Sequence, residues 1–198
     1  MVLFTRNLFV TQNKMEFKMQ KTLLGTAIAL TVSVLALPVS AADGTITING
    51  KLTQQTCTVK INNGTADAVI SLPTLSTSAL DAAKKVAGRT AFTMNLTGCT
   101  PASGSVRAYF EHGPTVDAAS GRLNNMQTTD AAKNVQIQLR DNDENDVYVG
   151  NTSQRTNPAT DVSAAGTADL LYSAYYYATA PAEAGGLATS VTYSIDYQ

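Results

Sequence analysis

Cys57 and Cys99 are the residues whose chemistry the sequence defines best, because they are its only two cysteines and 41 residues separate them. A reactive thiol pair would favour a C-x-x-C spacing or a neighbouring histidine, and neither is present. In an oxidising compartment, an isolated pair is most simply a structural disulfide. Closing a loop of this size would stabilise the fold by about 4 kcal/mol in the chain-entropy description.

Other candidates for chemistry are weak. His112, the only histidine, precedes a Gly-Pro turn, which indicates a surface loop and not a general base with an orienting partner. The acidic run DNDEND at 141–146 places oxygen-bearing side chains at alternate positions, as calcium loops do. Its sixth position is Asp146 instead of glycine, however, and its twelfth is Thr152 instead of glutamate. No catalytic residue, metal site or cofactor is therefore predicted.

Three consecutive tyrosines, Tyr175, Tyr176 and Tyr177, suggest a sugar-binding face, since amphipathic rings suit that task. Neighbours along a strand point to opposite faces, however. The pattern favours one tyrosine in the core and two exposed.

The N-terminal segment has the pattern of a secretory signal peptide. An uncharged apolar run at 23–37 follows Lys18 and Lys21 and ends before the small-residue site Val39-Ser40-Ala41. Its 15 residues fall short of the roughly 20 that a transmembrane helix needs. Residues 1–41 are interpreted as a signal peptide, in which 1–14 form a start-site extension ahead of better start positions at Met15 and Met19.

The part of the chain after the predicted cleavage site is mildly acidic. The first 41 residues hold four of the 14 basic residues and one of the 15 acidic ones, so the remaining 157 carry a net charge of about −4. This balance argues against nucleic acid or an anionic membrane as a partner. The length suits one domain with a single core.

Alternating apolar and polar residues, interrupted by turn-forming residues, recur along the chain. In DGTITINGKL (43–52), one face of the expected strand carries Gly44, Ile46, Ile48, Gly50 and Leu52. Inward positions in later strands are predicted at Phe92, Met94, Leu96, Val106, Ala108, Phe110, Val135, Ile137, Leu139, Val191, Tyr193, Ile195 and Tyr197. Only residues 78–86 suit a short helix. Many short strands with one buried face predict an antiparallel β-sandwich.

Several features then point in one direction. The two cysteines stand in TQQTCTV and FTMNLTGC, the first strand reads G-x-I-x-I-x-G, Tyr197 is penultimate, and Gly185 is fourteenth from the C-terminus. The segment VQIQLRDNDENDVYVG has the form of a mid-chain hairpin. Together these features resemble the pilin subunits of chaperone-usher fimbriae, near the major subunits of type 1-like pili.

The resemblance implies an all-β fold: an incomplete immunoglobulin-like antiparallel β-sandwich that lacks its seventh strand and is completed by a donor strand from a neighbouring subunit. Residues 42–50 would form the donor-strand extension and 51–198 the pilin domain. The donor residues would be Gly44, Ile46, Ile48 and Gly50, with Gly44 at the place of the family's donor-strand glycine. The acceptor groove, which also contacts the chaperone, would include Gly185, Val191, Tyr193, Ile195 and Tyr197.

The implied function is that of a structural subunit of a surface fimbria that supports adhesion, not that of an enzyme. The subunit would be exported through the periplasm to the cell surface and polymerise by donor-strand exchange. Its partners would be identical or related pilin subunits joined head to tail, a periplasmic chaperone and an outer-membrane usher, with no nucleic acid and no stable membrane insertion. Two alternatives stay open: a secreted β-sandwich that binds a carbohydrate or host protein as a monomer, and a hydrolase.

Overall fold

The computed structural model describes residues 44, 46–50, 52 and 54–198. The predicted signal peptide, residues 1–41, lies outside the described residues. The chain divides into two units, Met1–Ile48 and Asn49–Gln198. The described residues of the first unit have no regular secondary structure. The second unit contains all of the strands described below.

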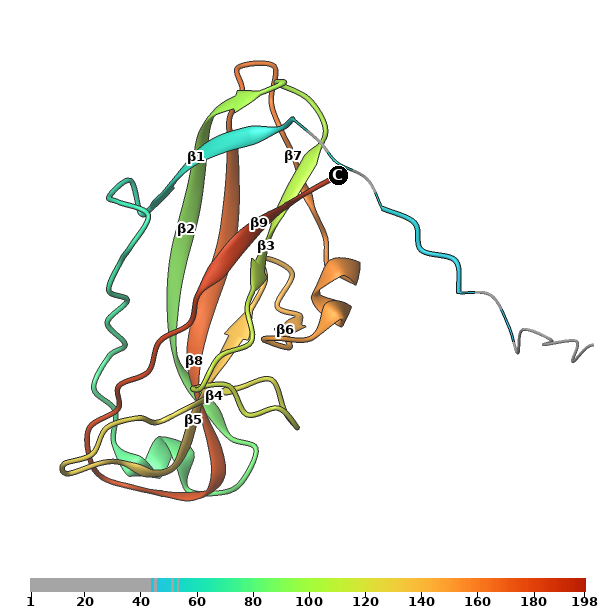
Figure 1. Cartoon of the computed structure of the whole chain (residues 1–198). Helices are drawn as coiled ribbons and strands as arrows, with labels where there is room; N and C mark the ends of the chain where they lie inside the picture. Colours follow the sequence, from blue (N-terminus) through green and yellow to red (C-terminus); the bar gives the residue numbers. More distant parts are fainter. Residues whose placement is uncertain (1–43, 45, 51, 53) are drawn as a thin grey trace, which may run out of the picture. The chain divides into compact units, whose positions relative to one another are not determined.

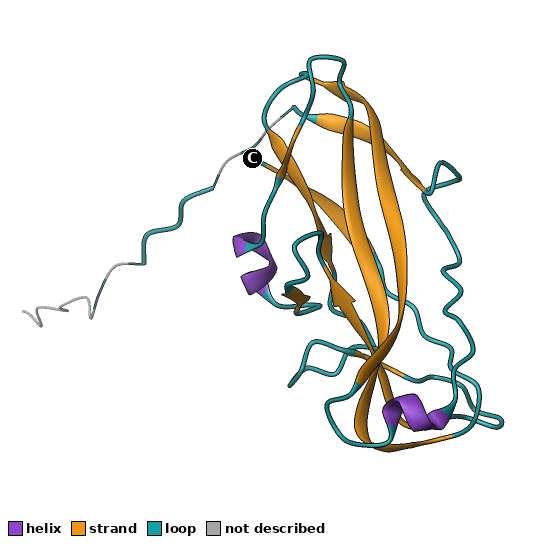
Figure 2. Cartoon of the chain, turned by 180° about the vertical axis from the view of Figure 1, so that it is seen from behind, coloured by secondary structure: helices purple, strands orange, loops and turns teal. Residues whose placement is uncertain are grey.

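Two antiparallel sheets form the second unit (Figures 1 and 2). The larger has the spatial order β1 (Thr56–Ile61), β2 (Val86–Thr100), β8 (Ala168–Glu183), β5 (Lys133–Arg140) and β4 (Leu123–Asn124), with β6 (Asp146–Val147) also paired to β5. The smaller has the order β7 (Thr160–Asp161), β3 (Ser105–Phe110) and β9 (Tyr193–Tyr197). Pairing between these strands is antiparallel throughout, so the predicted all-β antiparallel fold is confirmed.

Helical structure in the described residues consists of two short 3-10 helices, η1 (Thr77–Leu80) and η2 (Thr152–Thr156). The helix expected over 78–86 is therefore shorter than predicted, since β2 already begins at Val86. Each helix starts after a polar residue, Ser76 or Asn151, whose side chain accepts a backbone N–H of the first turn. No helix in the described part of the chain has the length and apolar composition needed to cross a lipid bilayer.

The core lies between the two sheets and confirms the predicted alternation. Met94 and Val106, which come from opposite sheets, are completely buried. The Tyr172 ring stacks on Phe92 and meets the Phe110 ring edge-on, at centroid distances of 5.9 and 5.1 Å. Its hydroxyl accepts the backbone N–H of Ala108 at 3.1 Å. Every predicted inward residue of β2, β3 and β5 is buried.

Candidate functional site

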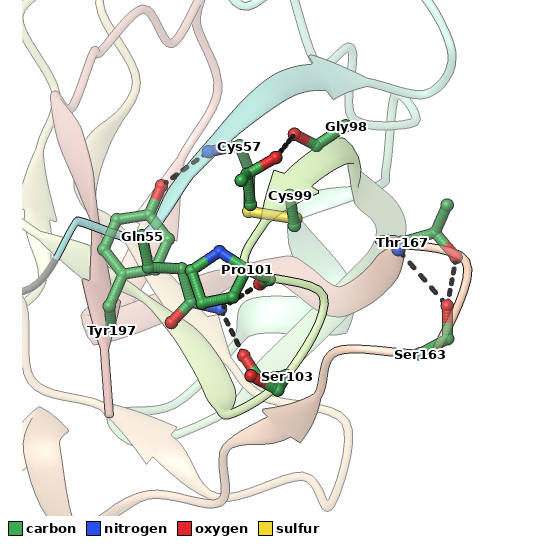
Figure 3. Close-up of a disulfide and its surroundings, with 10 residues drawn as sticks. Gln55, Cys57, Gly98, Cys99, Pro101, Ser103, Ser163, Thr167 and Tyr197 are labelled. Carbon is green, nitrogen blue, oxygen red and sulfur yellow. Dashed lines mark hydrogen bonds between the residues drawn. A yellow bond between two sulfur atoms is a disulfide. The ribbon is translucent and has the colours of Figure 1, made fainter.

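The disulfide lies at one end of the sandwich, beside the last residues of the chain (Figure 3). It joins Cys57 in β1 to Cys99 in β2, which confirms the predicted pairing. The hydroxyl of Tyr197 accepts the backbone N–H of Cys57 at 3.1 Å. The amide of Gln55 donates to the carbonyl of Ser103 at 2.6 Å. The Tyr197 bond joins the C-terminal end of β9 to β1, and the Gln55 bond joins the residues before β1 to the loop between β2 and β3.

Beyond these contacts, an apolar groove of about 690 Å³ opens beside β9. Residues 66–72, the segment that follows β1, form its first bank, and residues 187–193, which lead into β9, form its second bank. Figure 1 shows both segments on the same side of the second unit. The floor is made of core side chains of both sheets: Ile61, Phe92, Met94, Phe110, Leu123, Ile137, Leu139 and Ala174. The groove therefore reaches the hydrophobic core, whose side chains on the floor each keep no more than 9% of their surface accessible.

The first bank is an extended segment without strand partners. Its inward side chains, Ile70 and Leu72, are half-buried and pack against the core. Among the described residues, the backbone groups of 68–72 have no hydrogen-bond partner. A backbone in this condition beside an apolar groove can accept a further strand.

The second bank is paired along one side only. The carbonyls of Ala188 and Thr192 accept the backbone N–H groups of Met126 and Glu111, and the carbonyl of Ser190 accepts the hydroxyl of Thr115. The intervening backbone groups of Thr189 and Val191 have no partner among the described residues. Because successive residues of a strand direct their backbone groups to opposite sides, one edge of this segment is open.

The opposite edge of the smaller sheet is covered. β7 pairs with the first residues of β3. Further along, the buried side chain of Gln154 accepts the N–H of Phe110 at 3.0 Å and donates to its carbonyl at 2.9 Å. This amide takes the place of a neighbouring strand at that position. The sandwich thus covers one edge of this sheet and leaves open the edge that faces the groove.

Tyr193 spans one end of the groove. Its hydroxyl donates a 2.8 Å hydrogen bond to the carbonyl of Ala66, so its side chain bridges the two banks. Burial raises the pKa of Tyr193, and the carboxylate of Asp67 adds to the increase. The phenol therefore stays protonated at neutral pH and remains a donor.

A second hollow of about 390 Å³ continues from the other end of the groove. Tyr176 and Leu187 line both spaces and form the boundary between them. The Tyr176 ring packs directly on Gly88, where an added Cβ would lie 2.7 Å from Cδ2 of the ring. Burial also raises the pKa of Tyr176. The boundary is therefore fixed by packing against β2.

The predicted acceptor residues fall into three places. Val191 and Tyr193 line the groove, and Gly185 lines the second hollow. Ile195 and Tyr197 pack against the core further along β9 and line neither space. An added Cβ at Gly185 would lie 2.3 Å from the backbone nitrogen of Ala132, so only glycine fits this close approach.

Other groove residues were not predicted from the sequence: the first bank, Tyr176, Leu187 and Thr189. Some of them carried a readable signal. Ile70 and Leu72 lie on one face of a possible strand with the polar Ser71 between them, although Val69 is apolar. The alternation of the C-terminal strand extends back through Thr189 to Leu187.

The predicted donor residues lie in the N-terminal extension. Its large apolar side chains are fully exposed, at 89% for Ile46, 88% for Ile48 and 101% for Leu52. Isolated apolar residues on a surface are ordinary, but three on one face of an alternating segment are suited to burial by a partner.

The tyrosine prediction was wrong in part. Tyr175 is buried and the other two are half-buried, so none is exposed. The Tyr175 hydroxyl donates to Glu144 at 2.5 Å, and the Arg122 guanidinium lies 3.5 Å from the ring centre of Tyr177. Side chains from other segments cover the outward rings, while Tyr176 faces the groove.

The remaining candidates have ordinary structural surroundings. His112 is exposed. In the acidic run, one carboxylate oxygen of Asp141 accepts the backbone N–H groups of Asp143 and Asn145, each at 2.9 Å. The loop is thus held by its own hydrogen bonds.

Comparison with known proteins decides the family. The family model for the type-1 fimbrial protein A, FimA, matches residues 72–198. The chain belongs to this family. It is 44% identical over 165 residues to the major fimbrial subunit SMF-1 of Stenotrophomonas maltophilia, covering 81% of this chain and 96% of the relative. It is 39% identical over 163 residues to the F17 fimbrial protein of Escherichia coli, covering 80% and 89%.

Solved structures agree in fold. The P pilus rod subunit PapA matches with a TM-score of 0.50 at 19% identity, over 71% of this chain and 99% of that structure. The type I fimbria protein BPSL1626 of Burkholderia pseudomallei matches with a TM-score of 0.50 at 17% identity, over 72% and 95%. The predicted pilin fold and the predicted function as a fimbrial structural subunit are confirmed.

Proposed function

We propose that this fimbrial subunit polymerises by donor-strand exchange, in which residues 42–50 of one copy, continued to Leu52, fill the groove of the next copy. Residues 1–41 would direct export and be removed, and 51–198 would form the pilin domain. A periplasmic chaperone would occupy the groove first and deliver the subunit to an outer-membrane usher, from which the fibre reaches the cell surface. The subunit has no catalytic part in this process.

The observation that carries the proposal is the open backbone edge beside a groove whose floor is made of core side chains. The two banks offer unpaired backbone groups on both sides of a groove with an apolar floor. A strand laid between them would hydrogen-bond to both banks and place alternate side chains on the floor, as strand addition does in peptide recognition. Backbone pairing would supply affinity, and the inward side chains would supply specificity.

The extension has the composition that such a groove requires. Ile46 and Ile48 are β-branched and exposed, and each would contribute about 1.5 to 3 kcal/mol if its side chain were fully buried. Leu52 adds a third apolar side chain on the same face. The outward face, which includes Thr47 and Asn49, is polar and suits solvent.

The head-to-tail direction of this contact explains why a fibre would form. The donor segment and the groove are different surfaces of the same chain, so the contact is heterologous and leaves one free groove and one free extension at the ends. Repetition gives an open polymer unless the ends meet. A subunit that only bound a ligand as a monomer would not need the two surfaces to match.

Deletion of residues 42–49 tests the proposal. We expect the variant to accumulate as a soluble complex with the chaperone and to be absent from surface fibres, as measured by electron microscopy and immunoblotting of sheared fibres. A normal fibre yield from the deletion variant would refute the donor role.

A matched pair of point variants separates donation from a general effect of the extension. Ile48→Asp places a charge on the apolar face and should abolish incorporation into fibres, because the carboxylate would be buried without a partner. Thr47→Asp places the same charge on the outward face and should leave the fibre yield nearly unchanged. Equal yields from the two variants would contradict strand addition.

A further inference from the structure

Asparagine followed by glycine occurs twice in the chain, as Asn49-Gly50 in the N-terminal extension and as Asn63-Gly64 in the turn after β1. A chain can readily modify itself at such a pair, because glycine has no Cβ to keep its backbone nitrogen away from the asparagine side chain. The two pairs have the same sequence but different surroundings in the structure.

The modification needs only the chain and water. The backbone nitrogen of the glycine attacks Cγ of the asparagine; an N–Cγ bond forms, the Cγ–Nδ2 bond breaks, and the amide leaves as ammonia with the proton of the glycine nitrogen. Water then opens the resulting five-membered imide. Cleavage at Cγ gives aspartate, whereas cleavage at the backbone carbonyl carbon gives isoaspartate, in which the main chain runs through the former side chain.

At Asn63, hydrogen bonds hold the backbone away from this reaction. The N–H of Gly64 donates to the carbonyl of Ile61 at 2.9 Å, and the N–H of Asn63 donates to the side chain of Asn95 at 2.8 Å. A nitrogen whose proton is bonded within a turn cannot move over Cγ until the turn opens. This pair is therefore protected, although it is exposed to solvent.

At Asn49, the same two groups are unrestrained by the described part of the chain. Asn49 and Gly50 are exposed and lie outside regular secondary structure. Neither forms a backbone hydrogen bond with another described residue. Apart from its chain neighbours, Gly50 has no heavy atom within 4 Å of the place that a Cβ would occupy. Its nitrogen can therefore reach the side chain of Asn49.

We infer that Asn49 is a site of spontaneous deamidation in the unassembled subunit, and that the isoaspartate formed there removes the subunit from assembly. The second part rests on the proposed donor-strand function. In a filled groove, the backbone of the donor is hydrogen-bonded to the two banks, which holds the N–H of Gly50 as the turn holds that of Gly64. Assembly into a fibre therefore protects Asn49.

Isoaspartate disables the donor because it lengthens the main chain by one carbon atom. Side chains of a strand alternate between its faces, so Gly50 and Leu52 no longer share the face of Ile46 and Ile48. Aspartate at this position adds a charge on the outward face but keeps the alternation. The extension of a free subunit thus has a limited lifetime as a donor.

The first test compares soluble subunit, purified from the periplasm with its chaperone, with sheared fibres, both incubated at mildly alkaline pH. Mass spectrometry of peptides measures amide loss at each site. We expect loss in the soluble subunit to be at least roughly fivefold faster at Asn49 than at Asn63, because the turn must first lose hydrogen bonds. In fibres, loss at Asn49 should be at least roughly tenfold slower than in the soluble subunit.

Labelling by an isoaspartyl methyltransferase with S-adenosylmethionine measures the isoaspartate itself. Asn49→Gln should remove the label from the soluble subunit, because the longer side chain no longer places its amide carbon for closure of the five-membered ring. Asn63→Gln is the matched control and should retain the label.

The second test uses synthetic peptides covering residues 42–54, with asparagine, aspartate or isoaspartate at position 49. Each is added to the chaperone complex of the variant that lacks residues 42–49, and release of the chaperone is measured. We expect the isoaspartate peptide to release it at least roughly tenfold less well than the aspartate peptide, which has the same mass and charge but an unaltered main chain.

The outcomes separate this inference from the proposed function. Equal amide loss at Asn49 and Asn63, or equal activity of the aspartate and isoaspartate peptides, would overturn the inference and leave donor-strand exchange standing. Equal loss at Asn49 in soluble subunit and fibres would overturn the inference and also count against the donor role, because residue 49 would then be unbound in the fibre. Failure of the asparagine peptide to release the chaperone would refute the donor role itself, whatever the rate of amide loss.

Discussion

Replacement of Gly185 by alanine should destabilise the subunit, although this glycine is exposed. An added Cβ would lie 2.3 Å from the nitrogen of Ala132, 2.4 Å from the carbonyl carbon of Ala131 and 2.5 Å from the oxygen of Asp130. All three are backbone atoms, so no side-chain rotation can relieve the contact. The backbone at Gly185 and the backbone of residues 130–132 would have to move apart instead.

Moving these two segments apart would break two backbone hydrogen bonds made by Gly186. The N–H of Gly186 donates to Asp130 at 2.6 Å, and its carbonyl accepts the N–H of Ala132 at 2.9 Å. At about 0.5 to 1.5 kcal/mol each, their loss lowers the free energy of unfolding by about 1 to 3 kcal/mol. With an m-value of about 1 to 3 kcal/mol/M, the urea midpoint should fall by roughly 1 M.

Gly186→Ala is the matched control. Its added Cβ would meet only the Gln127 side chain, at 3.6 Å, which is ordinary contact. Both variants reduce the conformational entropy of the unfolded chain by a similar amount, so the difference between them isolates the backbone contact. Equilibrium urea unfolding of the oxidised monomer, followed by circular dichroism, measures both. Equal midpoints for the two variants would refute the reasoning.

Three further outcomes are expected. Gly44→Arg should block incorporation into fibres because the donor strand has no room for a side chain there; wild-type fibre yield, measured against Thr47→Arg on the outward face, would count against the assignment. Removal of Cys57 should lower the level of the subunit in the periplasm, because the loop to Cys99 is no longer closed, and an unchanged level on immunoblots would undermine the structural role of the disulfide. Hydrogen bonding from the Tyr175 hydroxyl, with smaller contributions from neighbouring arginines, lowers the pKa of Glu144 from its ordinary value of 4.5. The ionised Glu144 carboxylate therefore contributes its full stabilisation above pH 4.5, and this stabilisation is lost as the pH falls through the lowered pKa. Acid titration should consequently lower the free energy of unfolding of the wild type more than that of Glu144→Gln. Parallel curves of unfolding free energy against pH for the two proteins would contradict this.

The local pattern of the sequence was enough to predict the core positions of β2, β3 and β5. A strand places alternate side chains on opposite faces whatever its neighbours are, so Phe92, Met94 and Leu96 could be assigned inward, and all three are buried. The disulfide followed with equal directness, since two cysteines allow only one intramolecular pairing.

Alternation does not show which segment covers a given side chain. Tyr175 points outward as its position requires, yet the loop after β5 supplies Glu144 and buries it. For the same reason, the groove could be predicted beside the C-terminal strand, but its first bank and the Tyr193 bridge across it could not.

Those features arise where segments distant in sequence approach without pairing. Tyr193 reaches Ala66 across 127 positions, and Tyr176 of β8 lines the same two spaces as Leu187 of the segment that leads into β9. The sequence by itself determined which residues face inward and which cysteines pair, because these depend on local geometry and on compartment. Tertiary structure alone decided where a groove remains above the inward-facing side chains, because that depends on the contacts of every surrounding segment at once.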